Sequence, residues 1–214
     1  CPLGRERSFA PQSISEINLR KHLTHLTSDI GVRLAGTAEE TAACDYIAAT
    51  FESAGAQVCV EPFPVNVRRV ESEHLEVYAS GLWTRYPCSL FSSTPGTDGK
   101  TVEAQLAFFE APGEYQRSDL SHLRGKAVVH LGTHIESREN YRRLMAAEPA
   151  CILFVDVRYP GVVPLADGMF PAYTRALGAK PSVNVAYADA WNWNVAGATA
   201  VRLCVSGGMQ PGES

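Results

Sequence analysis

The stretch Arg33-Leu34-Ala35-Gly36-Thr37, with the helix-like run that follows it to Ala54-Gly55, decides the fold of the first part of this chain. Thr37 and Glu40 have the spacing of a capping box, in which a hydroxyl and a carboxylate satisfy free backbone N–H groups at a helix start. Apolar residues then recur at helical spacing: Ala43, Ile47, Phe51 and Ala54. Gly55 stands where a glycine ends a helix. The stretch therefore predicts a glycine-containing loop that leads into an amphipathic helix.

The segments on either side of this helix extend the pattern. Ser13 and Glu16 form an earlier capping-box spacing and predict a first helix, whose apolar face is Leu19, Leu23 and Leu26. Residues 57–63 alternate between apolar and polar side chains, which predicts a strand directly after the second helix. The order helix, loop, helix, strand is a common opening of α/β proteins.

The rest of the chain is rich in predicted strands. Residues 75–79 alternate cleanly, and residues 81–125 are punctuated by proline and glycine around one strand candidate at 104–110. From Gly125 onward, a buried strand at 126–131, a helix at 137–147 and a second buried strand at 151–156 fit a βαβ unit. The remaining segments are an irregular stretch at 159–180, strands at 181–185 and 200–205, and a glycine-rich linker at 207–212.

Composition excludes several classes of partner. The 214 residues are 45% hydrophobic and carry a net charge of −4, so no strong basic footprint argues for nucleic acid or an anionic membrane. No run approaches the ~20 apolar residues of a membrane span. No secretory signal is visible at the N-terminus, and cytoplasmic and secreted locations both stay open. The six cysteines show no Cys-x-x-Cys spacing, and we expect them to be mostly reduced and structural.

The second part of the chain resembles the protease-associated domain. That family has a Gly-Lys-hydrophobic strand, a helix, a turn into a strand that ends in Asn or Asp, and a later Pro-x-Val strand that enters an Asp-Gly-like turn. The matching segments here are Gly125-Lys126-Ala127-Val128-Val129, the helix to Ala147, residues 149–156, and Pro181-Ser182-Val183 followed by Asp189-Ala190. Glu148-Pro149-Ala150 replaces the usual Ala-Gly-Ala, and Ala190 stands where glycine is common.

The first part of the chain is similar to the start of metallopeptidase family twenty-eight, the two-zinc aminopeptidases. The resemblance rests on residues 33–37, Tyr46-Ile47, Phe51 and Ala54-Gly55. Several members of that family carry a protease-associated domain inserted after this opening. The resemblance implies an α/β fold of the α+β kind. Its parts are peptidase-like helices and first strands over residues 1–79, a protease-associated domain over 80–205 and a linker over 206–214.

The family's zinc ligands come after the inserted domain and begin with a His-x-Asp. This sequence contains no His-x-Asp, and we expect it to end before the catalytic half begins. The resemblance therefore assigns no catalytic, metal or cofactor residue to this chain, although it implies two zinc ions for the full-length family. The best local ligand-like cluster is His130, His134 and Glu136, but it spans a strand end and a turn, and a polar strand-end cluster is the favoured interpretation.

Three functional hypotheses follow. The favoured one is the non-catalytic portion of a zinc aminopeptidase, in which the protease-associated domain roofs the active-site cleft and shapes access for a peptide substrate. Whether this chain is itself an enzyme stays open, and a missing catalytic domain and a second copy of the chain are its possible partners. The second hypothesis is a stand-alone protease-associated binding module. The third is an autonomous hydrolase built around His130, His134 and Glu136. The favoured hypothesis also predicts, at the N-terminal helices and the strand near Val60, either an exposed apolar patch above the few hundred Å² usual for monomers or association through that patch. Full burial of Ile47, Phe51 and Val60 in a monomer would argue against it.

Overall fold

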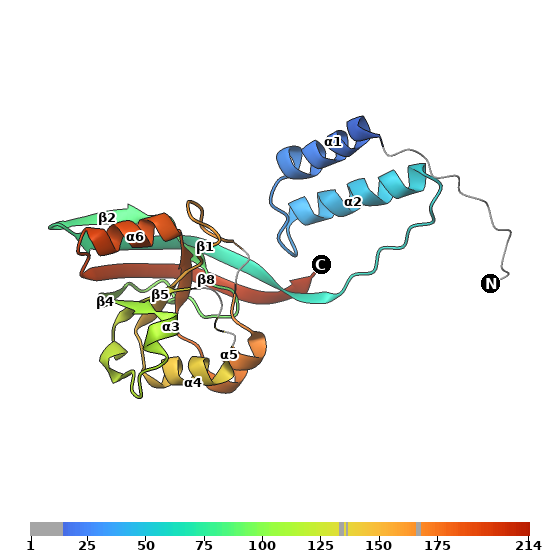
Figure 1. Ribbon diagram of the computed structural model, residues 1–214. Coiled ribbons are helices and arrows are strands. Elements are labelled where there is room, and N and C mark those ends of the chain that lie inside the picture. The colour runs from blue at the N-terminus through green and yellow to red at the C-terminus, as the bar shows by residue number, and fades with distance from the viewer. Residues whose placement is uncertain (1–14, 133–134, 136, 166–167) are drawn as a thin grey trace. The chain divides into compact units, whose positions relative to one another are not determined.

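The computed structural model describes residues 15–132, 135, 137–165 and 168–214 (Figure 1). The chain divides into two compact units. One comprises residues up to Val65 together with Glu213–Ser214, and the other comprises Asn66–Gly212. We call them the N-terminal unit and the sheet unit.

Two helices form most of the N-terminal unit. Helix α1 covers Glu16–Thr24 and continues into a π-helical turn at His25–Asp29. The Ser15 side chain caps α1 by accepting a hydrogen bond from the Asn18 N–H at 3.4 Å. The predicted capping residue, Ser13, lies outside the described residues, and the observed cap is the next serine along the chain.

Helix α2 covers Ala38–Ser53, and both of its predicted ends are confirmed. Thr37 Oγ1 accepts from the Glu40 N–H at 3.3 Å, while Glu40 Oε2 accepts from the Gly36 N–H at 2.6 Å. At the other end Gly55 has a φ of 87°, the Gly55 N–H donates to Glu52 O at 2.9 Å and the Ala56 N–H donates to Phe51 O at 3.0 Å. This is a Schellman motif, which needs a residue without a Cβ at its left-handed position.

The strand predicted at 57–63 is wrong. The chain there is neither helix nor strand, and strand β1 begins only at Pro64. Phe63 and Ser214 exchange two backbone hydrogen bonds of 3.1 Å, but no segment in the described part of the chain pairs with residues 57–62. The alternation of Val58 and Val60 is typical of a strand. A strand also needs a neighbouring strand that forms hydrogen bonds with its backbone N–H and C=O groups.

The sheet unit contains an eight-stranded mixed sheet in the order β2-β1-β8-β4-β5-β6-β7-β3. Strands β4, β5, β6 and β7 are parallel, and the pairs β1–β2, β4–β8 and β3–β7 are antiparallel. The strands are β1 Pro64–Ala79, β2 Leu82–Tyr86, β3 Ser89–Leu90, β4 Val102–Glu110, β5 Ala127–Leu131, β6 Cys151–Val155, β7 Ser182–Val185 and β8 Ala200–Glu213. The α/β fold class predicted from the sequence is confirmed.

The predicted βαβ unit is present. Helix α4, Arg138–Ala146, connects the parallel strands β5 and β6, and Ser137 caps it by accepting from the Asn140 N–H at 3.2 Å. Tyr141 and Leu144 are buried on its inner face. A short helix α3, Ala111–Glu114, and a 3-10 turn at Ser121–Leu123 precede β5.

The structure has helices in two segments for which the sequence predicted another conformation. Helix α5, Pro171–Leu177, lies in the stretch expected to be irregular, and helix α6, Tyr187–Val195, contains Asp189-Ala190, where a turn was expected. The stretch expected to be a linker also differs, since β8 continues to Glu213. Gly207 has a φ of 91°, and a Cβ there would collide with the backbone of Arg69 in β1. The glycines that suggested a flexible linker instead allow two long strands to approach closely.

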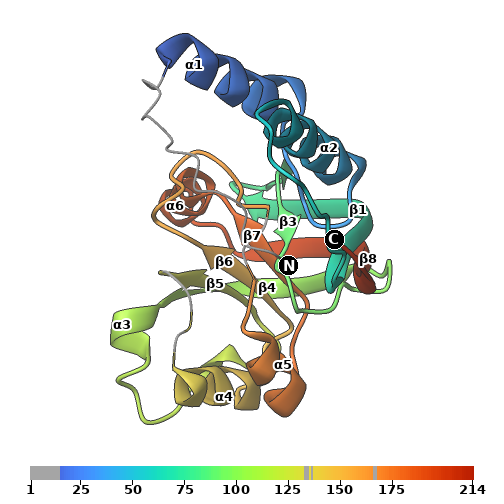
Figure 2. The ribbon, with the colours of Figure 1, turned by 90° about the vertical axis from the view of Figure 1, so that its right-hand side faces the viewer.

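The parallel strands are buried on both faces, as continuous apolar strands are when helices cover a sheet. One face carries a cluster with Val129, Leu153 and Trp193 of α6, and the opposite face carries a cluster with Val128, Ile152 and Leu144 of α4. Figure 2 shows α6 on one side of these strands and α4 with α5 on the other. Within the described ranges, no helix has the length and apolar character to cross a membrane.

Candidate functional site

His130 is a buried packing residue. Its side chain is 1% exposed, and the Phe109 and Phe154 rings lie 5.4 and 5.3 Å from its ring centroid. Its Nε2 lies 3.2 Å from the Tyr115 hydroxyl, while Nδ1 has no hydrogen-bond partner among the described residues. Burial lowers the pKa of His130 to about 4, so the imidazole is neutral at pH 7. His134 and Glu136 lie outside the described residues, so the structure does not test the predicted cluster.

The other described histidines are dispersed. His22 contacts the Tyr46 hydroxyl at 2.6 Å, and His25 pairs with Asp29 at 2.9 Å, both in the N-terminal unit. In the sheet unit His74 and His122 pair with Glu76 and Glu114. In the part of the chain that the structure covers, no three His, Cys, Asp or Glu side chains converge as metal ligands would. The described residues therefore do not fit a two-zinc site.

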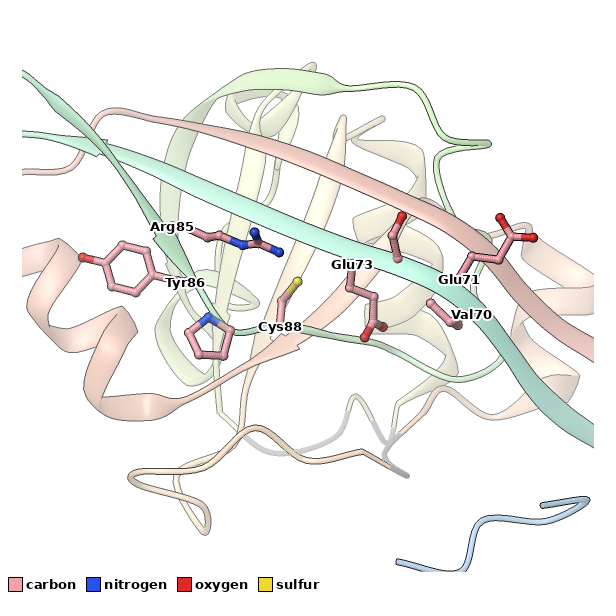
Figure 3. A pocket seen from close by; sticks show the side chains of 8 residues that line it. Val70, Glu71, Glu73, Arg85, Tyr86 and Cys88 are labelled. Atoms are coloured by element: carbon pink, nitrogen blue, oxygen red, sulfur yellow. The ribbon is translucent and has the colours of Figure 1, made fainter. Parts of the chain in front are cut away.

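A cavity of about 500 Å³ opens where strands β1 and β2 separate (Figure 3). Its lining comprises Val70, Glu71, Ser72 and Glu73 from β1, and Arg85, Tyr86, Pro87 and Cys88 from the end of β2 and the residues after it. The β1–β2 ladder runs from Ala79↔Leu82 to Leu75↔Tyr86 and stops there. Pro87 has no N–H to continue the ladder, and the chain then crosses to pair with β7 as strand β3. A wedge therefore opens between β1 and the segment that leaves it.

Side chains bridge this wedge. The Glu73 carboxylate accepts hydrogen bonds from the Arg68 guanidinium and from the Leu90 backbone N–H, and Arg68 also reaches Ser89 Oγ at 3.5 Å. The ion pair is mostly buried, with Arg68 and Glu73 side chains 18% and 17% exposed. β1 and β3 are thus held together through side chains. Sequence reasoning missed this site, although Pro87, which cannot donate a backbone hydrogen bond to a neighbouring strand, was a usable signal.

The Cys88 thiol in this cavity is not a nucleophile at neutral pH. Burial raises its pKa to about 12, and the nearby Glu73 carboxylate adds to the effect. Because the thiolate is the reactive form, Cys88 behaves as a small apolar residue. The five cysteines that the structure describes are free, including the buried Cys151.

A second cavity, of about 680 Å³, lies within the N-terminal unit between helix α2 and the extended segment at 56–60. Ile47, Phe51 and Val60 line it and are 41%, 55% and 60% exposed. The predicted exposure of these three side chains is confirmed. Apolar side chains gathered along one groove are the usual mark of an interaction surface.

Solved structures with a similar fold include zinc aminopeptidases and an M28 peptidase. A peptidase M28 precursor from Shewanella amazonensis has a TM-score of 0.70 and 17% identity, covering 91% of this chain and 47% of that chain. A zinc aminopeptidase from Bacillus subtilis has a TM-score of 0.63 and 17% identity over 90% of this chain and 44% of its own. An aminopeptidase from Aneurinibacillus has a TM-score of 0.51 and 18% identity, with coverage of 92% and 46%.

The chain thus shares the fold of part of these proteins and spans less than half of their length. No protein-family profile and no curated protein matches the sequence. At these identities the likeness establishes the fold. The mixed sheet with its helical opening is therefore an arrangement also found in zinc aminopeptidases.

Proposed function

We propose that this chain is the non-catalytic portion of a zinc-dependent aminopeptidase, and that the sheet unit is a protease-associated domain that roofs the active-site cleft. The main support for this proposal is the extent of the structural similarity, because 90–92% of this chain matches 44–47% of each peptidase. A generic α/β opening next to an unrelated sheet would not be expected to match the same proteins along nearly its whole length.

The exposed groove in the N-terminal unit supports the proposal. Helix α2 presents Ile47 and Phe51, and residues 57–62 are extended without a strand partner among the described residues. An unpaired extended segment next to an apolar helix face is what the margin of an incomplete sheet looks like. In the proposed enzyme, the catalytic half supplies the adjoining strands and covers the helix.

The zinc ions belong to the rest of the proposed enzyme. A zinc site there would supply activation of a water molecule and polarisation of the scissile carbonyl, and it would need several convergent His, Asp and Glu ligands with supporting hydrogen bonds. The described residues offer no such group. This chain's contribution is therefore to shape access for the peptide substrate, while the catalytic groups lie elsewhere in the protein.

Zinc titration of this chain tests whether the zinc ligands lie in another part of the proposed enzyme. We expect isothermal titration calorimetry to find no tight stoichiometric zinc binding, and we expect no hydrolysis of aminoacyl-4-nitroanilides. The His134→Ala variant is the control for the one cluster that lies partly outside the described residues. Tight zinc binding and turnover that are both lost in His134→Ala would overturn the proposal in favour of an autonomous hydrolase.

A stand-alone binding module is the second candidate. The sheet unit favours it because that unit has its own buried clusters on both faces of the parallel strands. The helices of the N-terminal unit favour the peptidase portion, because a module that only binds does not require them. The two candidates make different predictions for the gene. The peptidase portion, which we favour, predicts a His-x-Asp segment encoded after these residues, and the stand-alone module does not.

A further inference from the structure

From the wedge between β1 and β2 we infer that the sheet unit binds an extended peptide segment, which adds to the free edge of β1 at Val70–Glu73 and places an acidic side chain next to Arg85. The inference does not depend on the aminopeptidase proposal, because it rests on the sheet unit alone. Its basis is an unpaired strand edge, a cavity beside that edge and an unpaired cation on the opposite rim.

The edge of β1 is open over a defined length. Strand β2 pairs with β1 only from Leu75 to Ala79, and in the described chain no other strand lies against Val70–Glu73 on that side. Four residues of strand span about 13 Å. Unpaired backbone N–H and C=O groups along such an edge are a template for another strand.

The space beside this edge suits a peptide. The cavity is about 500 Å³, within the range of about 300–1,000 Å³ found for ligand pockets. Figure 3 shows Arg85 and Cys88 on one rim and Glu73 and Val70 on the other, with the open space between them. The wedge persists because Glu73 and Arg68 hold β1 and β3 through their side chains.

The charges in the cavity select the peptide. The Glu73 carboxylate is neutralised by Arg68, and the Glu71 carboxylate accepts a hydrogen bond from Ser206 Oγ at 2.9 Å. Arg85, by contrast, has no ion-pair partner within the described ranges, and its guanidinium is free to take a carboxylate in two parallel hydrogen bonds. An acidic side chain of the bound peptide would provide this carboxylate.

The same charges disfavour a second copy of this chain as the occupant. If two β1 edges paired with each other, Glu71 of one copy would be brought close to Glu71 of the other, and like charges opposite one another destabilise a sheet. The favoured occupant is therefore an extended acidic segment of another protein.

A short defined peptide tests the inference. The probe is fluorescein-labelled acetyl-Thr-Val-Glu-Val-Thr-amide, with its glutamine and lysine counterparts, titrated into the full chain and followed by fluorescence anisotropy. We expect the glutamate peptide to bind, the glutamine peptide to bind about fivefold more weakly, and Arg85→Glu to reverse the preference in favour of lysine. Arg175→Gln, which changes an exposed arginine on α5, is the matched control and should bind like the wild type.

Backbone methylation separates edge pairing from simple charge attraction. One peptide is N-methylated at both valines and another at the glutamate and both threonines. Because alternate N–H groups of a strand point to opposite sides, pairing with β1 should abolish binding for one peptide and spare the other. Amide signals of Val70–Glu73 in ¹⁵N-labelled protein should shift with the peptide that binds. Equal binding of both methylated peptides, no effect of Arg85→Glu, or no binding by the wild type at millimolar peptide would overturn the inference.

Discussion

The burial of His130 is the residue feature with the clearest measurable consequence. Its pKa is about 4 in the folded chain, below the ordinary 6.5, because the ring is enclosed by aromatic side chains and its neutral form is preferred. Between pH 6.5 and about 4 the unfolded state therefore binds more protons than the folded state. Stability is full above pH 6.5 and falls as the pH drops through this window.

This gives a prediction for the pH dependence of unfolding. A shift from 6.5 to about 4 corresponds to roughly 3 kcal/mol of stability lost across the window. Urea denaturation at pH 7, 5.5 and 4 should show that loss, and the difference should shrink strongly in His130→Gln, which cannot titrate. The variant also controls for carboxylates that protonate below pH 5. An identical pH dependence in both proteins would contradict the assigned burial.

Local elements were predictable where the signal lay within a few residues. Capping side chains and periodic apolar residues correctly indicated helices α2 and α4, and continuous apolar runs correctly indicated strands β5 and β6. Each of these signals lies within the element itself or directly next to it. The failures at residues 57–63 and 206–213 involve partners that are distant in the sequence. Among the described residues, 57–62 have no neighbouring strand, whereas residues 206–213 gain one in β1, and neither fact is encoded locally. The wedge at Pro87 depends on β3 crossing to β7, which is also a long-range event.

Gly207 allows a direct test of the long β8 strand. Alanine at this position would force a side chain into a left-handed backbone with φ 91° and press its Cβ against Arg69, so we expect Gly207→Ala to destabilise the fold by about 2 kcal/mol or more. Gly208→Ala is the matched control because a Cβ there meets open space. Thermal unfolding of both variants should separate them clearly. Equal melting temperatures would mean that residues 206–213 are a linker after all.

Considered as a whole, the molecule combines a self-contained sheet unit with an N-terminal unit whose apolar groove is open. The sheet unit buries both faces of its parallel strands, and the N-terminal unit leaves Ile47, Phe51 and Val60 exposed. That contrast, with the coverage of less than half of each similar peptidase, is the physical ground on which we propose that this chain is part of a larger peptidase. No catalytic residue could be predicted from the sequence, because it contains no His-x-Asp motif.

The most direct measurement of the central claim is zinc-dependent aminopeptidase activity of the protein encoded by the full reading frame, compared with the same protein lacking residues 66–212. The account predicts that the full protein releases N-terminal residues, that a chelator abolishes this activity and zinc restores it, and that loss of the sheet unit alters the relative kcat/KM for short and long peptides. An absence of zinc-dependent hydrolysis in the folded full protein would contradict the account.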